Sequence, residues 1–141
     1  MSKAVVIFGS TTGNCENMAE IIEAKVKGAG WDVTLKNVAD ASAAEVTDYD
    51  LILLGSSTWG DGELQDDFID FESALSEVDL TGKKAAVFGC GETSWPEFCA
   101  AVDIIEERVK GCGATLTTEG LKVDGDIIED EVSAWAEKAI A

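Results

Sequence analysis

The stretch AVVIFGSTTGNCENMAEII, residues 4–22, decides the fold. It opens with an unbroken apolar run at 4–8, which is typical of a strand buried on both faces in a parallel sheet. Small and hydroxyl-bearing residues follow at once, GSTTGN, and a segment with helical spacing begins behind them. A buried strand that passes into a helix through such a loop indicates a parallel α/β unit with space for a small ligand in the turn.

The same alternation of strand and helix continues along the chain. We expect strands at 4–8, 51–54 and 85–88, and weaker, more alternating ones at 32–37 and 115–123. Helical spacing is found at 14–27, 41–46, 65–76, 98–110 and 127–140. The last of these segments carries one apolar stripe, made of Ile128, Val132, Trp135 and Ala139.

This order predicts an α/β fold, a doubly wound five-stranded parallel sheet with helices on both faces and thus three layers, α/β/α. No linker, repeat or low-complexity segment interrupts residues 1–141, so we expect one domain. Ligands of such sheets bind beyond the carboxyl ends of the strands at the topological switch point. The loops after the strands are therefore the informative ones.

Composition removes several classes of function. The formal charge is -18, from 28 acidic and 10 basic residues without histidine, which disfavours binding to nucleic acids and excludes histidine-dependent catalysis. The charge either keeps the protein soluble or steers it toward basic partners. The chain shows neither an apolar leader nor a run long enough to cross a bilayer, so we expect no membrane association and a cytoplasmic location.

The cysteines do not indicate a metal site. Cys15, Cys90, Cys99 and Cys112 contain no C-x-x-C pair and none of the close spacings of zinc or iron–sulfur ligands. We expect Cys90 and Cys112 to act as small buried apolar residues.

The first loop, GSTTGN, has the features of an anion site. It lacks the lysine of a P-loop and the spacing G-x-G-x-x-G, but it offers hydroxyl and N–H donors at the start of a helix. This donor set suits one phosphomonoester better than a triphosphate with magnesium. An ordinary helix cap is the simpler interpretation, but it accounts for one hydroxyl and not for three in succession.

Two later loops each place a tryptophan at a strand end. SSTWGDGELQDDF follows the strand at 51–54, and CGETSWPEFCAAV follows the strand at 85–88. Each indole could merely cover the sheet, or it could stack on a flat heteroaromatic ring. Together with the anion site, the two tryptophans, Trp59 and Trp95, predict a site for flavin mononucleotide (FMN), a flat ring on a phosphorylated tail.

These segments, together with EGLKVDGD at 119–126, resemble the short-chain flavodoxins of the Desulfovibrio type over nearly the whole chain. The resemblance implies the strand order 2-1-3-4-5. It implies that the phosphate is held by Ser10, Thr11, Thr12, Gly13, Asn14, Cys15 and Ser57. It also implies stacking by Trp59 and Trp95, backbone contacts from Glu92 and Cys99 to the pyrimidine edge, and a Gly60 carbonyl that accepts from the reduced flavin N(5)–H. The remaining cofactor-binding residues that we expect are Thr58, Asp61, Cys90, Gly91 and Phe98.

Three positions depart from the family pattern. Cys15 stands where threonine is usual, which replaces one hydroxyl donor by a weaker thiol and predicts somewhat weaker FMN binding. Trp95 stands where tyrosine is usual and keeps the stacking face. The segment from Gly60 to Leu64 is short for this type of flavodoxin.

The resemblance implies an electron carrier rather than an enzyme, because the cofactor itself supplies the redox chemistry. We expect a low-potential couple that cycles mainly between neutral semiquinone and hydroquinone, since carboxylates near the ring oppose the anionic hydroquinone. These carboxylates belong to Asp61, Glu63, Asp66, Asp67 and Glu92. We also expect a monomer that docks transiently on basic redox proteins.

Two other functions share this topology. One is a small flavin-dependent NAD(P)H or quinone reductase, for which the chain offers no insertion to hold a second substrate. The other is a phospho-receiver domain, for which the strand ends FGS and GSS lack the required aspartate.

Overall fold

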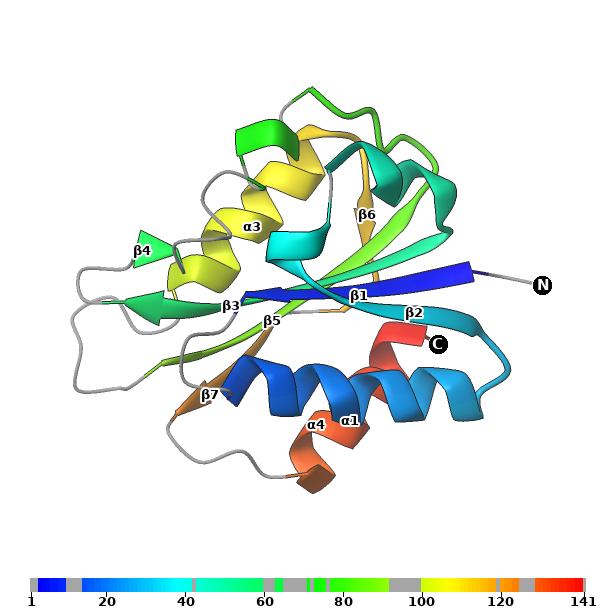
Figure 1. Cartoon of the computed structure of the whole chain (residues 1–141), viewed down its shortest axis with the longest axis vertical. Coiled ribbons are helices and arrows are strands. Elements are labelled where there is room, and N and C mark those ends of the chain that lie inside the picture. The colour runs from blue at the N-terminus through cyan, green and yellow to red at the C-terminus, as the bar shows by residue number, and fades with distance from the viewer. Residues whose placement is uncertain are drawn as a thin grey trace.

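The computed structural model describes residues 3–9, 14–41, 43–59, 63–64, 71, 73–75, 77–91, 100–118, 120–124 and 129–140. A central sheet runs through the molecule (Figure 1). Its strands follow the order β2 (Asp32–Asn37), β1 (Lys3–Gly9), β3 (Leu51–Trp59), β5 (Lys84–Gly91) and β6 (Thr115–Leu116). Each neighbouring pair in this order is parallel.

The fifth position of the sheet is shared by two short strands. β6 pairs with the beginning of β5, and β7 (Leu121–Asp124) pairs with its end, also in parallel. With β6 and β7 counted as one interrupted strand, the expected order 2-1-3-4-5 is confirmed. The single strand expected at 115–123 is wrong in its middle, where the pairing with β5 is broken.

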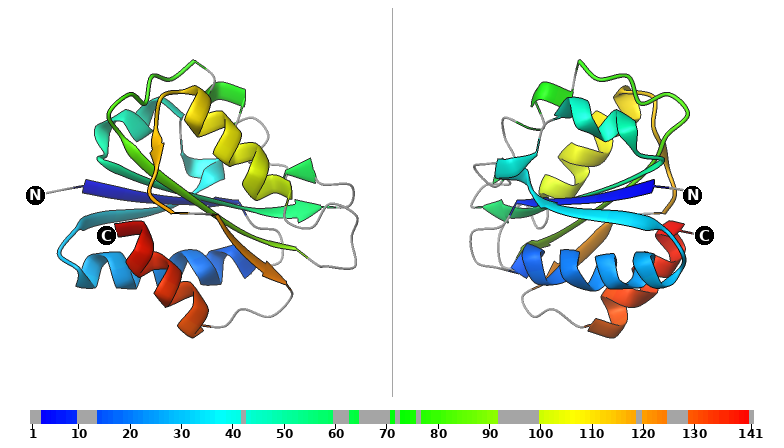
Figure 2. Two further views of the ribbon diagram at one scale, coloured as in Figure 1. Left: turned by 180° about the vertical axis from the view of Figure 1, so that it is seen from behind. Right: turned by 45° about the vertical axis from the view of Figure 1, so that its right-hand side comes forward.

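Helices cover both faces of the sheet (Figure 2). α1 (Asn14–Gly28) and α4 (Glu129–Ile140) pack on one face. α3 (Ala100–Gly111), the helical residues 71 and 73–75, and the 3-10 turns η1 (Val38–Asp40) and η2 (Ala43–Asp48) pack on the other. The predicted three-layer α/β/α architecture is therefore confirmed.

The sequence placed the start of α1 at Asn14 and the ends of α1, α3 and α4 within one residue of their observed last residues. Where a helix was expected at 41–46, the structure has the tighter 3-10 form instead, at Ala43–Asp48. Of the helix expected at 65–76, the structure describes only residues 71 and 73–75, and these are helical. α3 and α4 are described from Ala100 and Glu129 onward, so the expected first residues of both helices lie outside the described residues.

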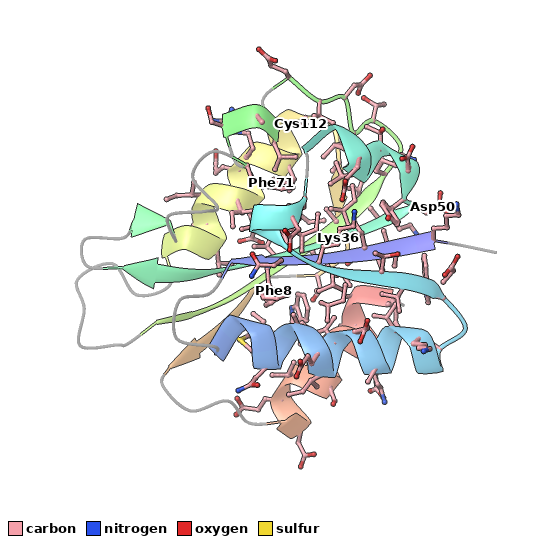
Figure 3. All side chains as sticks on the ribbon, viewed as in Figure 1. Phe8, Lys36, Asp50, Phe71 and Cys112 are labelled. Carbon is pink, nitrogen blue, oxygen red and sulfur yellow. The ribbon has the colours of Figure 1, made fainter. Side chains whose placement is uncertain are left out.

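One ion pair ties the 3-10 turn η2 to the edge strand β2. Lys36 Nζ lies 2.9 Å from Glu45 Oε1 (Lys36 is labelled in Figure 3). The hydrogen bond to this carboxylate raises the pKa of Lys36 above 10.5, and the charges of Glu45, Tyr49 and Asp40 add to that effect. The pair thus holds η2 against β2.

The core consists of two halves separated by the sheet. Along β1, Val5 and Ile7 point toward the side of α3, whereas Val6 and Phe8 point toward α1 and α4, and all four are buried. The same alternation holds in β3 and β5, where successive apolar residues belong to opposite halves. Burial on both faces explains why these strands appear in the sequence as unbroken apolar runs.

The stripe predicted on the last helix is confirmed for its described residues. Val132, Trp135 and Ala139 are buried, while Ile128 lies outside the described residues. Trp135 meets Phe88 of β5 edge to face, with ring centroids 5.9 Å apart and an angle of 64° between the planes. Aromatic pairs favour this arrangement because a positive ring edge meets a negative ring face.

Cys112 is half-buried rather than fully buried, and it packs against the core on the side of α3. Its thiol donates a hydrogen bond to the carbonyl of Leu75, 2.9 Å away. Its own carbonyl accepts from the N–H of Leu80 at 2.8 Å. Cys112 thus joins the end of α3 to the chain that leads into β5. The side chain of Cys90 lies outside the described residues.

Candidate functional site

The crossovers of β1 and β3 leave the sheet in opposite directions. β1 continues into α1 on one face, whereas β3 leads to β5 through a segment whose described helical residues, 71 and 73–75, pack on the other face. The chain therefore leaves the carboxyl ends of these two neighbouring strands toward opposite faces of the sheet, which makes this edge the topological switch point. α1 begins here, at Asn14, so its N-terminal N–H groups and the positive end of its dipole belong to the same edge.

The three central strands end at different heights. Gly9, Ser56 and Gly89 form the last row to which all three strands contribute. Among the described residues only β3 and β5 continue beyond that row, with Ser57 paired to Cys90. Figure 1 shows β3 and β5 projecting past the end of β1. In the described part of the chain the edge therefore forms a step, with the end of β1 as its lower level.

Two phenylalanines and a glycine form the row beneath this step. Phe8 pairs with Gly55, and Gly55 pairs with Phe88 on the other side. Both rings are buried, and a Cβ at Gly55 would overlap the ring of Phe88. Phe8 lies between β1 and α1 (Figure 3). The end of the sheet therefore rests on a close-packed aromatic layer, which the sequence analysis did not predict.

A small hairpin extends β3 at the same edge. β4 (Glu63–Leu64) runs antiparallel to the end of β3, with Thr58 opposite Leu64 and Trp59 opposite Glu63. The backbone of Trp59 is thus held by pairing. This hairpin was missed in the sequence, although two strand ends joined by the three residues Gly-Asp-Gly are a known signal for it.

Seven of the expected cofactor-binding residues are described, and their backbones all lie at this edge. Asn14 and Cys15 form the first turn of α1, and the other five end two strands: Ser57, Thr58 and Trp59 in β3, and Cys90 and Gly91 in β5. The other ten lie outside the described residues: Ser10, Thr11, Thr12, Gly13, Gly60, Asp61, Glu92, Trp95, Phe98 and Cys99.

Neither a metal centre nor a membrane span is found in the described part of the chain. Among those residues no three histidine, cysteine or acidic side chains are grouped so as to hold a metal ion. None of the helices in the described ranges is long and apolar enough to cross a bilayer.

Comparison with known proteins identifies the family. The family model described as Flavodoxin matches residues 6–135. The chain belongs to the flavodoxin family. A flavodoxin from Maridesulfovibrio salexigens is 47% identical over 138 residues, which cover 96% of this chain and 94% of the relative. A flavodoxin from Nitratidesulfovibrio vulgaris is 41% identical over 145 residues, covering 99% and 98%.

Solved flavodoxin structures have the same fold. Oxidised Flavodoxin 1 from Bacillus cereus superimposes with a TM-score of 0.95 at 38% sequence identity, covering 99% of this chain and 97% of that one. A flavodoxin mutant from Fusobacterium nucleatum, solved with FMN bound, shares the fold with a TM-score of 0.83 at 18% identity. The matched region covers 99% of this chain and 94% of the Fusobacterium nucleatum chain.

Membership of the family confirms the resemblance to flavodoxins of the Desulfovibrio type. Flavodoxins are electron-transfer proteins rather than enzymes, and FMN is the cofactor of the family. The expectation of an electron carrier is therefore confirmed at this level, in preference to a reductase or a phospho-receiver domain.

Proposed function

We propose that this flavodoxin carries single electrons at low potential with FMN bound non-covalently at the carboxyl edge of β1, β3 and β5. The observation that supports the proposal best is the convergence at this edge. The start of α1 and the ends of β3 and β5, three segments far apart in sequence, bring seven of the expected cofactor-binding residues there.

The donor set at the start of α1 fits a phosphate. The loop that leads into the helix contains Ser10, Thr11 and Thr12 and carries no cationic side chain, so hydrogen bonds and the helix dipole must neutralise the anion. Charge-assisted hydrogen bonds of this kind contribute about 1.5–3 kcal/mol each. We assign the phosphate to this loop together with Asn14, Cys15 and Ser57.

The ends of β3 and β5 suit a flat ring. Trp59, at the paired end of β3, and Trp95, in the loop after β5, would stack on the two faces and exclude water. Thr58, Asp61, Cys90, Gly91 and Phe98 would line the ring, with Glu92 and Cys99 at its pyrimidine edge. Bound FMN supplies the one-electron chemistry, and the Gly60 carbonyl would accept a hydrogen bond from the N(5)–H of the reduced ring.

The acidic residues in the loops after β3 and β5 would lower the reduction potential of the bound flavin. We place five acidic residues of these loops near the ring: Asp61, Glu63, Asp66, Asp67 and Glu92. One carboxylate at about 12 Å in water contributes roughly 0.3 kcal/mol. Five therefore sum to on the order of 1.5 kcal/mol, or about 65 mV for a one-electron couple. These charges would lower the midpoint potential of the second reduction step. We propose that the carrier works mainly across that step, between neutral semiquinone and hydroquinone.

The same charge defines the partners. With a net charge of -18, the protein would attract redox proteins that present a basic patch and form small, transient complexes with them. We propose that it acts in the cytoplasm as a monomer, with neither nucleic acids nor membranes among its partners.

Stepwise anaerobic reduction of the FMN-loaded protein, followed by absorption spectroscopy, tests this function. We expect flavin bands, then a long-wavelength neutral semiquinone, then bleaching at a potential below that of free flavin. A second step no more negative than that of free flavin would refute the low-potential assignment. Failure to bind FMN, or steady oxidation of NAD(P)H by the pure protein, would refute the carrier itself.

A further inference from the structure

The interruption of the fifth strand contains two extra residues. Ala85 pairs with Leu116, and Phe88 pairs with Leu121. β5 advances three positions between these two pairs, whereas the partner strand advances five. The N–H of Thr117 still reaches the carbonyl of Ala85 at 3.0 Å, so the departure from the ladder lies between Thr117 and Leu121.

A side chain of α3 receives the N–H at the end of this interruption. The N–H of Gly120 donates to Glu106 Oε2 at 3.1 Å, across a partly buried contact. Gly120 immediately precedes β7, whose first residue, Leu121, is already paired with Phe88. The carboxylate thus holds the chain at the point where pairing with β5 resumes.

The fit at this point leaves no room for another atom. A Cβ on Gly120 would overlap Val102 Cγ1 and lie 3.1 Å from Glu106 Oε1. Val102 and Glu106 are one helical turn apart on α3, and Val102 is fully buried. The helix therefore fixes Gly120 through one apolar and one polar contact.

The contact between Glu106 and Gly120 bears on the proposed cofactor site because β7 pairs with the end of β5. Its last two pairs join Val123 to Cys90 and Asp124 to Gly91. Cys90 and Gly91 are both expected cofactor-binding residues at the end of β5. A shift of β7 along or away from β5 would therefore move the backbone on which that side of the site is built.

We propose that Glu106 is a positioning residue for the FMN site: by holding Gly120 it fixes the register of β7 against the end of β5. This inference rests on the proposed function for its effect on FMN, but the register itself is a property of the protein without cofactor. The two parts are therefore measured separately.

The experiment compares Glu106→Ala and Gly120→Ala with two controls. Glu106→Gln keeps an oxygen acceptor at the same place. Asp79→Ala removes the hydrogen bonds from the N–H and hydroxyl of Thr81, which lie ahead of the other end of β5. FMN dissociation constants are measured by titration of the apoprotein, and amide hydrogen exchange of the apoprotein is followed residue by residue.

We expect Glu106→Ala and Gly120→Ala to weaken FMN binding about fivefold, the equilibrium effect of one ordinary hydrogen bond. Exchange should accelerate at residues 120–124 and at Cys90 and Gly91. Glu106→Gln should restore most of the affinity, and Asp79→Ala should leave it unchanged.

Unchanged exchange at 120–124 in Glu106→Ala would overturn the role of Glu106 in the register. Faster exchange there without loss of affinity, or an equal loss in Asp79→Ala, would make the contact merely structural and overturn the positioning role. Failure of the wild-type protein to bind FMN would refute the proposed function and the effect on FMN, while the exchange data would still decide the register.

Discussion

The ring of Phe88 fills the space that a side chain at Gly55 would need, although the two residues lie on neighbouring strands. Phe88 in turn contacts Trp135 of α4 edge to face. Glycine at 55 is therefore a packing requirement of the layer beneath the switch point, and it does not serve a turn.

Gly55→Ala should destabilise the protein by about 1–3 kcal/mol, because the added methyl forces the buried ring of Phe88 out of place. Chemical denaturation measures the effect. Gly28→Ala is the matched control, since a Cβ at this helix end meets nothing within 4 Å. The control should be neutral or slightly stabilising. Equal stabilities of the two variants would contradict the packing argument.

Trp135→Ala should cost about 3–5 kcal/mol, because it leaves a cavity beside Phe88 in the half of the core under α1 and α4. Ile104→Ala on α3 provides the comparison. Ile104 is 37% exposed, and its truncation should cost only about 1 kcal/mol, well below the cost of the Trp135 truncation. Thermal and urea denaturation of both variants would show whether burial accounts for the difference.

The hydrogen bonds to Asp79 predict that the free energy of unfolding falls in acid. Thr81 donates to Asp79 Oδ1 from its hydroxyl at 2.6 Å and from its N–H at 3.0 Å, which lowers the pKa of that carboxyl below 3.8. A lowered folded-state pKa stabilises the fold above the unfolded-state pKa, and this contribution is lost as pH falls through the folded-state value.

The difference in Tm between wild type and Asp79→Asn should therefore be constant near neutral pH and shrink below about pH 4. Thr81→Val removes the stronger of the two hydrogen bonds. In that background the dependence on pH should be weaker. A difference in Tm that stays the same down to pH 2 would refute the argument.

Cys15→Thr should tighten FMN binding by about fivefold, because a hydroxyl donates a stronger hydrogen bond to phosphate than a thiol does. Cys15→Ala serves as the control. It removes the thiol donor but keeps the backbone N–H in the first turn of α1, so it should bind FMN no better than wild type. Tighter binding by both variants would show that size, and not hydrogen bonding, governs this position.

Electron exchange with a basic redox protein should slow by about tenfold or more as salt is raised from low to physiological strength. The rate falls with salt because the net charge of -18 attracts a basic partner and added ions screen that attraction. An acidic redox protein of similar potential is the comparison, and its exchange should be slower at low salt and rise with added salt. Stopped-flow kinetics measure both, and rates independent of salt would leave the charge without a role in docking.

The fold could be predicted from the sequence where burial leaves a simple pattern. β1 and the centres of β3 and β5 are covered on both faces, so their apolar runs are unbroken, and the stripe on α4 has the spacing of one helical face. The order of the strands came from the resemblance to flavodoxins and is confirmed by the pairing.

Features that depend on contacts between distant segments could not be predicted in this way. Residues 115–123 look like one strand, because the interruption depends on pairing with β5 and on Glu106 of α3, and only Gly120 hints at it. The edge that carries the site follows from the strand ends. Its aromatic layer does not, because it arises from the register of Phe8, Gly55 and Phe88.

The division of the core by the sheet also bears on how the chain folds. Val5 and Val6 are neighbours in β1, but they are buried in opposite halves of the core. Truncating each in turn therefore reports on two separate packing events from one strand. If one half condenses first in the transition state, φ-values along β1 should alternate between high and low from one residue to the next.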